Sequence, residues 1–319
     1  MKDEVVFYFE NDQVVGLDAQ YCGLALLPPG LEKLAGLKQL YLRGNRLSSL
    51  PEWLWRLGDL ETLSLGQNLL PSLPDAIGNL KALRQLYLDT LNLSALPASI
   101  GGLVNLRVLD LGHNLLAGLP ESLGRLETLT FLYIHDNRLA DAPNWLGRLR
   151  NLVYLNISDN RLTSLPDSLG SLAPLKELRG YHNQLASLPD AIGDLANLKE
   201  LHLEDNRLAF LPDSISRLAN LRKLGLKDNR LTALPDSIGS LASLTDLDLR
   251  NNQLTSLPPS LSRLAHLREL DLRANRLAAL PEGIAYLPDL EKLDLRWNRI
   301  SPVPGWIQDL ERRGCIVYL

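Results

Sequence analysis

Leucine and other apolar residues recur along the chain at a fixed spacing, and this pattern is the strongest signal in the sequence. In each period two apolar residues are separated by a single residue, as at Leu247 and Leu249. This alternation indicates a strand whose leucines face inward while the residue between them faces out. Because these segments return at equal intervals, we expect short parallel strands stacked into one sheet.

Proline and asparagine keep the same interval as the leucines. Proline recurs every 23 residues from Pro28 to Pro304, and the Leu-Pro-Asp triplets predict short helical turns, because proline suits a first helical position and an acid suits the helix dipole. Asparagine recurs with one interruption, Leu91, and a buried amide can satisfy backbone groups where the chain bends. The predicted asparagine ladder is Asn45, Asn68, Asn114, Asn137, Asn160, Asn183, Asn206, Asn229, Asn252, Asn275 and Asn298.

The two ends of the chain read as caps, because no repeat can bury its leucines alone. Residues 1–24 are expected to form a hairpin and the first strand, with Cys22 one period before Asn45, and residues 305–319 a short helix and a last strand. Residues 25–304 hold the repeats. We therefore expect a single domain.

The repeat Leu-x-x-Leu-x-Leu-x-x-Asn-x-Leu-x-x-Leu-Pro resembles the leucine-rich repeat superfamily over nearly the whole chain. Its 23-residue form is similar to the intracellular class of Shoc2- and Scribble-type proteins, plant Ras-group repeat proteins and bacterial Roco arms. The resemblance implies an α/β solenoid, a horseshoe with a concave parallel sheet and short helical or 3-10 turns on the convex side. It also implies a non-catalytic scaffold for a partner protein, sometimes a small GTPase or another signalling protein.

Two other functions stay open. The chain can be the recognition arm of a multidomain signalling enzyme, such as a kinase, a Roco-type GTPase or a ubiquitin ligase. It can also be an engineered consensus scaffold, although Leu91 and Gly180, which stands where the second strand leucine belongs, argue against such regularity. We expect the repeats of these two residues to be weaker or distorted.

Composition narrows the choice of partner and compartment. With 45% hydrophobic and 22% charged residues the chain is expected to fold, and a net charge of −4 gives no basic surface for nucleic acid. No apolar run is long enough to span a bilayer, and the N-terminus has no signal-peptide pattern. Cys22 and Cys315 lie far apart, which favours a reducing cytoplasm, with delivery into a host cell as an alternative. We expect a monomer.

The sequence contains no phosphate loop, no nucleophile elbow and no metal-ligand motif. We therefore expect no enzyme activity, no cofactor and no metal, and we expect both cysteines to be structural.

The candidate binding surface is the outward side of the strands, where aromatic, imidazole and guanidinium groups gather in the middle repeats. Such residues commonly anchor interfaces, although strands favour tyrosine and phenylalanine in any case. The predicted contact residues are Phe131, Tyr133, His135, Tyr154, Arg179, Tyr181, His182 and His202. Further along, Asp248, Asp271 and Asp294 alternate with Arg250, Arg273 and Arg296, as a self-neutralising ladder or as a charged recognition strip that ends at Trp297.

Overall fold

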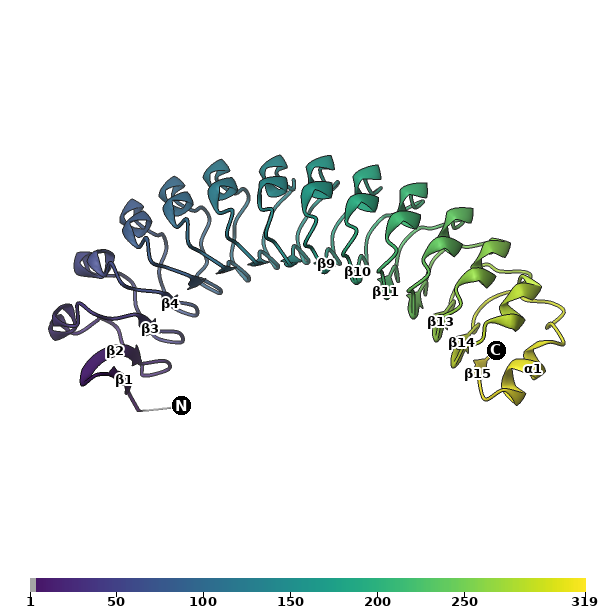
Figure 1. Cartoon of the computed structure of the whole chain (residues 1–319), viewed down its shortest axis with the longest axis horizontal. Coiled ribbons are helices and arrows are strands. Elements are labelled where there is room, and N and C mark those ends of the chain that lie inside the picture. The colour runs from purple at the N-terminus through teal and green to yellow at the C-terminus, as the bar shows by residue number, and fades with distance from the viewer. Residues whose placement is uncertain (1–3) are drawn as a thin grey trace. The chain divides into compact units, whose positions relative to one another are not determined.

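The computed structural model describes residues 4–319 and contains two compact units, Met1–Asn160 (unit 1) and Arg161–Leu319 (unit 2). Within each unit the strands lie side by side along one edge, and 3-10 helices line the opposite edge (Figure 1). The predicted solenoid, a parallel sheet backed by 3-10 turns, is confirmed. The organisation as one domain with two caps stays a prediction.

The sheet of unit 1 starts with the antiparallel pair β1 (Val6–Glu10) and β2 (Gln13–Asp18), and all later strands are parallel to β2. These strands have three residues each: β3 (Gln39–Tyr41), β4 (Thr62–Ser64), β5 (Gln85–Tyr87), β6 (Val108–Asp110), β7 (Phe131–Tyr133) and β8 (Tyr154–Asn156). Each residue pairs with the residue one period away, so equivalent side chains form straight columns across the sheet.

Unit 2 repeats this parallel arrangement. From β9 to β14 each strand residue pairs with the residue 23 positions later, and between β14 and β15 the step is 24. Its strands are β9 (Glu177–Arg179), β10 (Glu200–His202), β11 (Lys223–Gly225), β12 (Asp246–Asp248), β13 (Glu269–Asp271), β14 (Lys292–Asp294) and β15 (Ile316–Tyr318). Gly180 stands in place of the second inward leucine. It keeps the hydrogen bond to the next repeat, because its amide donates to the His202 carbonyl at 2.8 Å.

The 3-10 helices have five residues each. Those of unit 1 are η1 (Pro29–Lys33), η2 (Glu52–Arg56), η3 (Asp75–Asn79), η4 (Ala98–Gly102), η5 (Glu121–Arg125) and η6 (Asn144–Arg148). Those of unit 2 are η7 (Asp167–Ser171), η8 (Asp190–Asp194), η9 (Asp213–Arg217), η10 (Asp236–Ser240), η11 (Pro259–Arg263) and η12 (Glu282–Tyr286), followed by the α-helix α1 (Ile307–Arg312).

The repeated proline stands one position earlier than the sequence analysis expected. Pro51, for example, is the extended residue before η2, with φ −73° and ψ 150°, and the helix begins at Glu52. Its carbonyl accepts the first helical hydrogen bond, from Leu54 at 3.1 Å. The fixed φ of proline therefore sets the entry into the turn, and the acid that follows is the first helical residue.

The glycine that often follows the buried isoleucine or leucine of the turn is explained by packing between neighbouring repeats. A Cβ at Gly101 would lie 2.3 Å from the carbonyl oxygen of Ser122, and one at Gly239 would lie 2.2 Å from that of Ser260. Consecutive 3-10 helices thus approach so closely that only a hydrogen fits between them.

The ladder asparagines are buried, except the half-buried Asn298, and they bond to the backbone of two repeats. In unit 1, Asn137 donates through Nδ2 to the carbonyls of Leu111, Ile134 and His135, and its Oδ1 accepts from the Leu116 amide at 3.0 Å. The same pattern recurs in unit 2, for example at Asn252. Cys22 lies at the equivalent position one period before Asn45, and its thiol lies 3.4 Å from the Gln20 carbonyl oxygen.

Leu91 interrupts this network at one backbone group. Its side chain is buried, and the carbonyls of Leu65 and Leu88 still accept bonds from neighbouring ladder asparagines. The amide of Leu70, however, corresponds to amides that donate to a ladder Oδ1, and within residues 4–319 we find no acceptor for it. The cost of the substitution therefore falls on one buried N–H group.

We expect the Leu70 amide to exchange its hydrogen faster than the equivalent amides of Leu47 and Leu93, which donate to Asn68 and Asn114. Hydrogen exchange followed by NMR measures all three, and Leu91→Asn should slow exchange at Leu70 by supplying the missing acceptor. Equal protection of the three amides in the wild-type chain would contradict this assignment.

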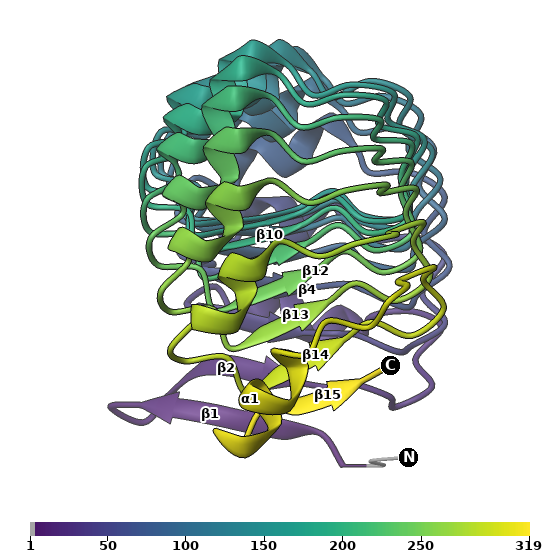
Figure 2. The same cartoon turned by 90° about the vertical axis from the view of Figure 1, so that its right-hand side faces the viewer.

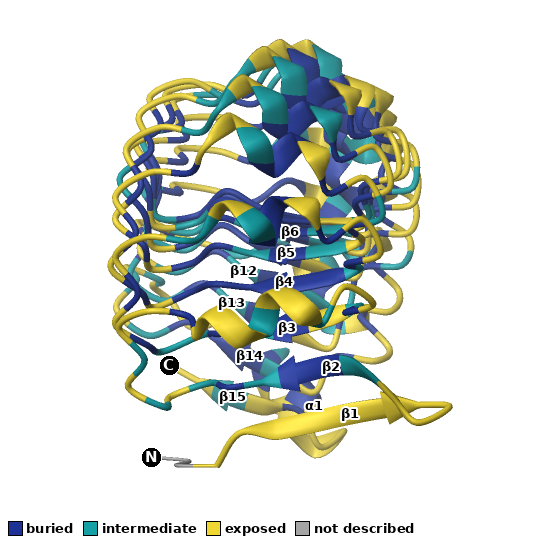
Figure 3. Ribbon diagram, turned by 90° about the vertical axis from the view of Figure 1, so that its left-hand side faces the viewer, coloured by how far each residue is buried: buried dark blue, intermediate teal, exposed yellow. Residues whose placement is uncertain are grey.

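The end elements differ in burial. Strand β1 is exposed along its length, while Gly16 and Leu17 of β2 are buried (Figure 3). At the other end α1 packs beside β15 and buries Ile307 and Leu310 (Figure 2). Over residues 4–319, no helix has both the length and the apolar character that a membrane crossing requires.

Candidate functional site

The side of each sheet opposite the leucine core, here called the sheet face, carries the candidate residues. A residue between the two inward apolar side chains of a repeat, such as Tyr133 between Leu132 and Ile134, points away from the core. Because neighbouring strands pair in register, these residues form one column in each unit, and the residues just before the first leucine form another.

Three rings from two adjacent strands form what we call the aromatic cluster: Phe131, Tyr133 and Tyr154. The ring centroids of Tyr133 and Tyr154 lie 4.9 Å apart, and those of Phe131 and Tyr154 lie 6.4 Å apart. Phe131 is 37% exposed and the two tyrosines are partly buried. The rings are tilted by 37° to 39° against each other, so they pack together on the sheet face and leave apolar surface open to solvent.

Two histidines lie beside the aromatic cluster in unit 1. The rings of His113 and His135 meet edge to face at 4.7 Å, with their Nε2 atoms 3.2 Å apart, and His113 Nδ1 lies 2.7 Å from an oxygen of Asp136. Burial, and then the neighbouring His113, lowers the pKa of His135 below its usual value. His135 is therefore a neutral, aromatic side chain at pH 7.

The other four predicted residues belong to unit 2, and most of them are already engaged in polar contacts. Arg179 donates to Glu177 at 2.6 Å. His202 contacts Glu200 at 3.2 Å and Glu204 at 3.4 Å, and Tyr181 packs edge to face on His182 at 5.0 Å. His182 is in the turn after β9, with a left-handed φ of 51°, rather than in the strand itself. These existing contacts lower the binding free energy that each side chain can contribute to an interface, because a partner would have to displace them.

The hydrogen bond that His202 donates to Glu204, together with the one to Glu200, raises the pKa of His202 against the effect of burial. A raised pKa in the folded chain stabilises it below the ordinary value near 6.5, and this contribution is lost as the pH rises through the folded-state pKa. We expect His202→Gln to lower the melting temperature most near pH 6, with the difference from wild type shrinking toward pH 8. A difference that does not change with pH would contradict the assignment, and Glu204→Gln should remove much of the pH dependence.

Glu177, Glu200 and His202 bring ligand-type atoms within 4.8 Å of one another. The same groups are engaged otherwise: Arg179 lies on Glu177, Lys223 lies 3.8 Å from Glu200, and both nitrogens of His202 face carboxylates. The charges within this group largely compensate one another, so we assign it no metal.

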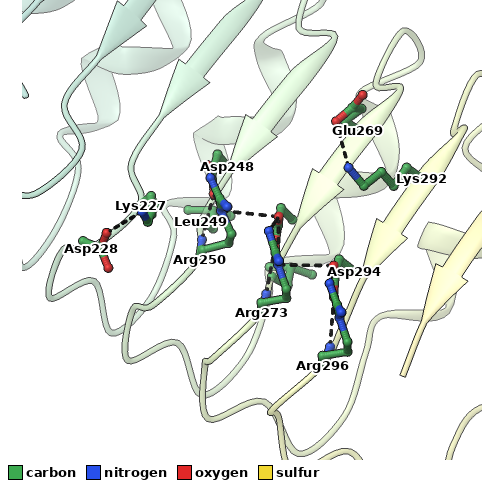
Figure 4. Close-up of polar contacts among 12 residues, drawn as sticks. Lys227, Asp228, Asp248, Leu249, Arg250, Glu269, Arg273, Lys292, Asp294 and Arg296 are labelled. Carbon is green, nitrogen blue, oxygen red and sulfur yellow. Dashed lines mark hydrogen bonds and ion pairs between the residues drawn. The ribbon is translucent and has the colours of Figure 1, made fainter.

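The aspartate and arginine columns of unit 2 form a connected ladder (Figure 4). Each arginine binds the aspartate two residues before it, as Arg250 binds Asp248 at 2.5 Å. Arg250 and Arg273 also reach the aspartate of the next repeat, at 3.4 Å and 3.2 Å. Asp294 is 1% exposed, and although burial alone acts to raise its pKa, the bonds and charges of Arg296 and Arg273 lower it. At the end of the ladder the Arg296 guanidinium lies 4.8 Å from the ring centre of Tyr318 and 5.6 Å from that of Trp297.

The sequence analysis missed a further polar and aromatic surface in unit 1. A shallow hollow of about 300 Å³ on the sheet face is lined by Tyr41, Tyr87, Asp89, Asp110 and Arg43, among other residues. Arg43 is bonded to Asp89 across the repeat between them, where Gly66 has no side chain to separate the two groups. Tyr41, Tyr87 and Asp110 belong to the same column as Tyr133, so the 23-residue step already contained the signal.

Comparisons with known proteins identify the repeats. A family model described as Leucine rich repeat matches residues 35–93, 181–231 and 219–277, a Leucine-rich repeat region model matches residues 75–179 and 97–205, and a third repeat model matches residues 289–310. No sequence among the curated proteins matches the chain.

Solved structures give the same fold. A leucine-rich repeat protein of Leptospira interrogans is 29% identical, with 95% of each chain covered and a TM-score of 0.66. The ectodomain of the Arabidopsis thaliana membrane receptor kinase GASSHO1/SCHENGEN3, solved with CASPARIAN STRIP INTEGRITY FACTOR 2, is 32% identical with a TM-score of 0.71, over 92% of this chain and 39% of that one. A Listeria monocytogenes internalin matches at 23% identity and a TM-score of 0.80, over 95% and 86% of the two chains.

The family models together cover most of the chain, and the structural matches extend over nearly all of it. The leucine-x-leucine strands, the asparagine ladder and the proline-led 3-10 turns account for these matches physically. The chain belongs to the leucine-rich repeat superfamily, and it is a protein-interaction repeat domain.

Proposed function

We propose that the chain is a non-catalytic binding module that holds a partner protein against its sheet face, with the aromatic cluster of unit 1 as the main contact. The observation that carries this proposal is the stack of Phe131, Tyr133 and Tyr154, whose rings hold one another in place and are partly exposed. Removing water from the exposed apolar surface of these rings is favourable, and rings that already pack on one another lose little side-chain entropy when a partner covers them.

The contrast with unit 2 supports this choice of contact. There the charged residues of the sheet face pair with one another, so a partner would have to break or desolvate existing ion pairs. Two related structures point to the form of the partner: the matched plant receptor ectodomain was solved with CASPARIAN STRIP INTEGRITY FACTOR 2, and the plant peptide hormone receptor RGFR1 was solved with RGF2. We propose that this chain binds a peptide segment of its partner.

The test is a selection from a library of random peptides displayed on phage, with the whole purified chain as bait. The wild-type chain should select related peptides, and Tyr154→Ala should select them poorly. Phe210→Ala, which removes an exposed ring outside the strands, should select them as well as wild type does. A wild-type chain that selects no peptide, or a Tyr154→Ala chain that selects the same ones, would overturn the proposal.

The proposal includes a small GTPase or another signalling protein as the partner class, the cytoplasm as the compartment and a monomer as the working form. Cell fractionation tests the compartment and light scattering tests the oligomeric state.

A second function, the recognition arm of a signalling enzyme, is favoured by the 32% identity to a receptor kinase ectodomain of which this chain covers 39%. A kinase, GTPase or ligase segment encoded in the same reading frame would establish it.

A further inference from the structure

Asp110 occupies a position on the sheet face of unit 1 with a tyrosine on either side. It pairs in register with Tyr87 of β5 and with Tyr133 of β7, in the column that points away from the leucine core. Neighbouring strands are about 4.8 Å apart, so the Tyr87 and Tyr133 side chains leave the sheet one strand spacing to either side of the carboxylate. The hollow described above, with Tyr41 and Asp89 in its lining, opens beside this carboxylate.

The charge of Asp110 has no counterion within the described chain. Its carboxylate accepts one hydrogen bond, from the Gly112 amide at 2.9 Å, and no lysine, arginine or histidine of residues 4–319 lies within ion-pair distance of it. Arg43 is bonded to Asp89, and burial holds the nearby His135 in its neutral form. Burial raises the pKa of Asp110 and the charge of Asp89 adds to this, against the hydrogen bond of Gly112 and the more distant charges of Arg43 and His135. The folded chain therefore keeps a partly desolvated carboxylate that has no direct ion-pair partner among the described residues.

The equivalent aspartates of unit 2 show which group Asp110 lacks. Asp248, Asp271 and Asp294 stand at the equivalent position of their repeats, and each is bonded to the arginine two residues later. Two residues after Asp110 the chain has Gly112, where a Cβ would lie 2.4 Å from the His135 ring. The repeat of Asp110 thus has the aspartate of the charged ladder without its arginine, and the His135 ring lies over Gly112 in the place of that side chain. The hollow lined by Tyr87 and Asp89 leaves the other side of the carboxylate open.

We propose that a cationic side chain of the bound partner, with arginine preferred over lysine, completes this site by pairing with Asp110 between Tyr87 and Tyr133. The proposal rests on the proposed function, and it adds the residue type that the partner must present. A guanidinium can bond to the carboxylate while its plane lies on a tyrosine ring, which a compact ammonium does less well. The ion pair also removes the unfavourable charge that the free chain carries at Asp110.

The experiment uses the peptide selection with three whole chains: wild type, Asp110→Asn and Asp248→Asn. Peptides selected by the wild-type chain should be enriched in arginine, and to a lesser degree in lysine, at one position. For such a peptide the dissociation constant, measured by fluorescence polarisation, should rise about tenfold or more with Asp110→Asn. Asp248→Asn is the matched control, because that acid already has Arg250, and it should change affinity by less than about twofold.

The outcomes separate this inference from the proposed function. If the wild-type chain selects no peptide, both fail together. If it selects peptides without a conserved cation, or if Asp110→Asn binds a cationic peptide as wild type does, the inference fails and the proposed function stands. Thermal unfolding guards against a folding defect: the side-chain amide introduced by Asp110→Asn keeps an oxygen for the Gly112 N–H group, so this variant should melt no lower than wild type at pH 7.

Discussion

Replacing Asn160 by alanine should lower the free energy of unfolding by about 1–3 kcal/mol, the largest effect on stability that we expect from a single polar residue. Asn160 Oδ1 accepts from the Leu139 amide at 3.0 Å, and its Nδ2 donates to the carbonyls of Ile134, Ile157 and Ser158. The carbonyls of Ile134 and Ser158 keep other donors, from Asn137 and Asp136 respectively. The buried Leu139 amide has no second acceptor among residues 4–319, so the substitution leaves this N–H group without a partner.

The matched control is Asn151→Ala, the same substitution at an exposed asparagine that also donates to a carbonyl, that of Glu127 at 2.8 Å. Since water can replace an exposed hydrogen bond, this variant should stay within about 0.5 kcal/mol of wild type. Urea unfolding followed by circular dichroism measures both variants. Equal losses at the two positions would show that burial of the ladder amide is not the source of its contribution.

The regular part of the fold could be predicted from sequence because each local signal has one physical solution. Leucines with a period of two, repeated every 23 residues, can be buried only in stacked strands, and the structure places Leu40, Leu63 and Leu86 in one fully buried row. The sequence did not determine where each repeated proline lies relative to its 3-10 helix, because the φ of proline suits both the residue before a helical turn and the first residue within it. Hydrogen bonding places Pro51 before the turn.

The candidate site was less predictable, because exposure and residue type do not reveal which side chains have already found partners. Arg179 and His202 look like interface anchors in the sequence, yet the structure pairs both with glutamates. Asp110 drew no attention, because the aspartates that repeat with arginines dominate the pattern, and only the comparison of equivalent positions shows that it lacks a cation within the described residues. The residues of a repeat surface that remain available to a partner are thus those that depart from the pattern of their column, as Asp110 does.

Truncating Tyr154 to alanine should weaken binding of a peptide selected by the wild-type chain by about 1–2 kcal/mol or more, or about 5- to 30-fold in the dissociation constant. Tyr154 contacts both other rings of the aromatic cluster, so its loss removes its own surface and also releases Phe131 and Tyr133 from their fixed positions. The fold should persist, because the ring lies on the sheet face and not among the core leucines.

Three further variants determine which part of the sheet face binds. Tyr286→Ala removes a tyrosine that is 72% exposed in η12, away from the strands, and should leave affinity within about twofold of wild type. Asp271→Ala should act weakly and mainly through salt dependence, because Asp271 is paired with Arg250 and Arg273. Tyr181→Ala should cost less than Tyr154→Ala, since Tyr181 packs on one histidine rather than within a ring stack. If Tyr154→Ala binds normally and Asp271→Ala does not, the partner binds the charged ladder of unit 2 and the aromatic cluster is a feature of the scaffold alone.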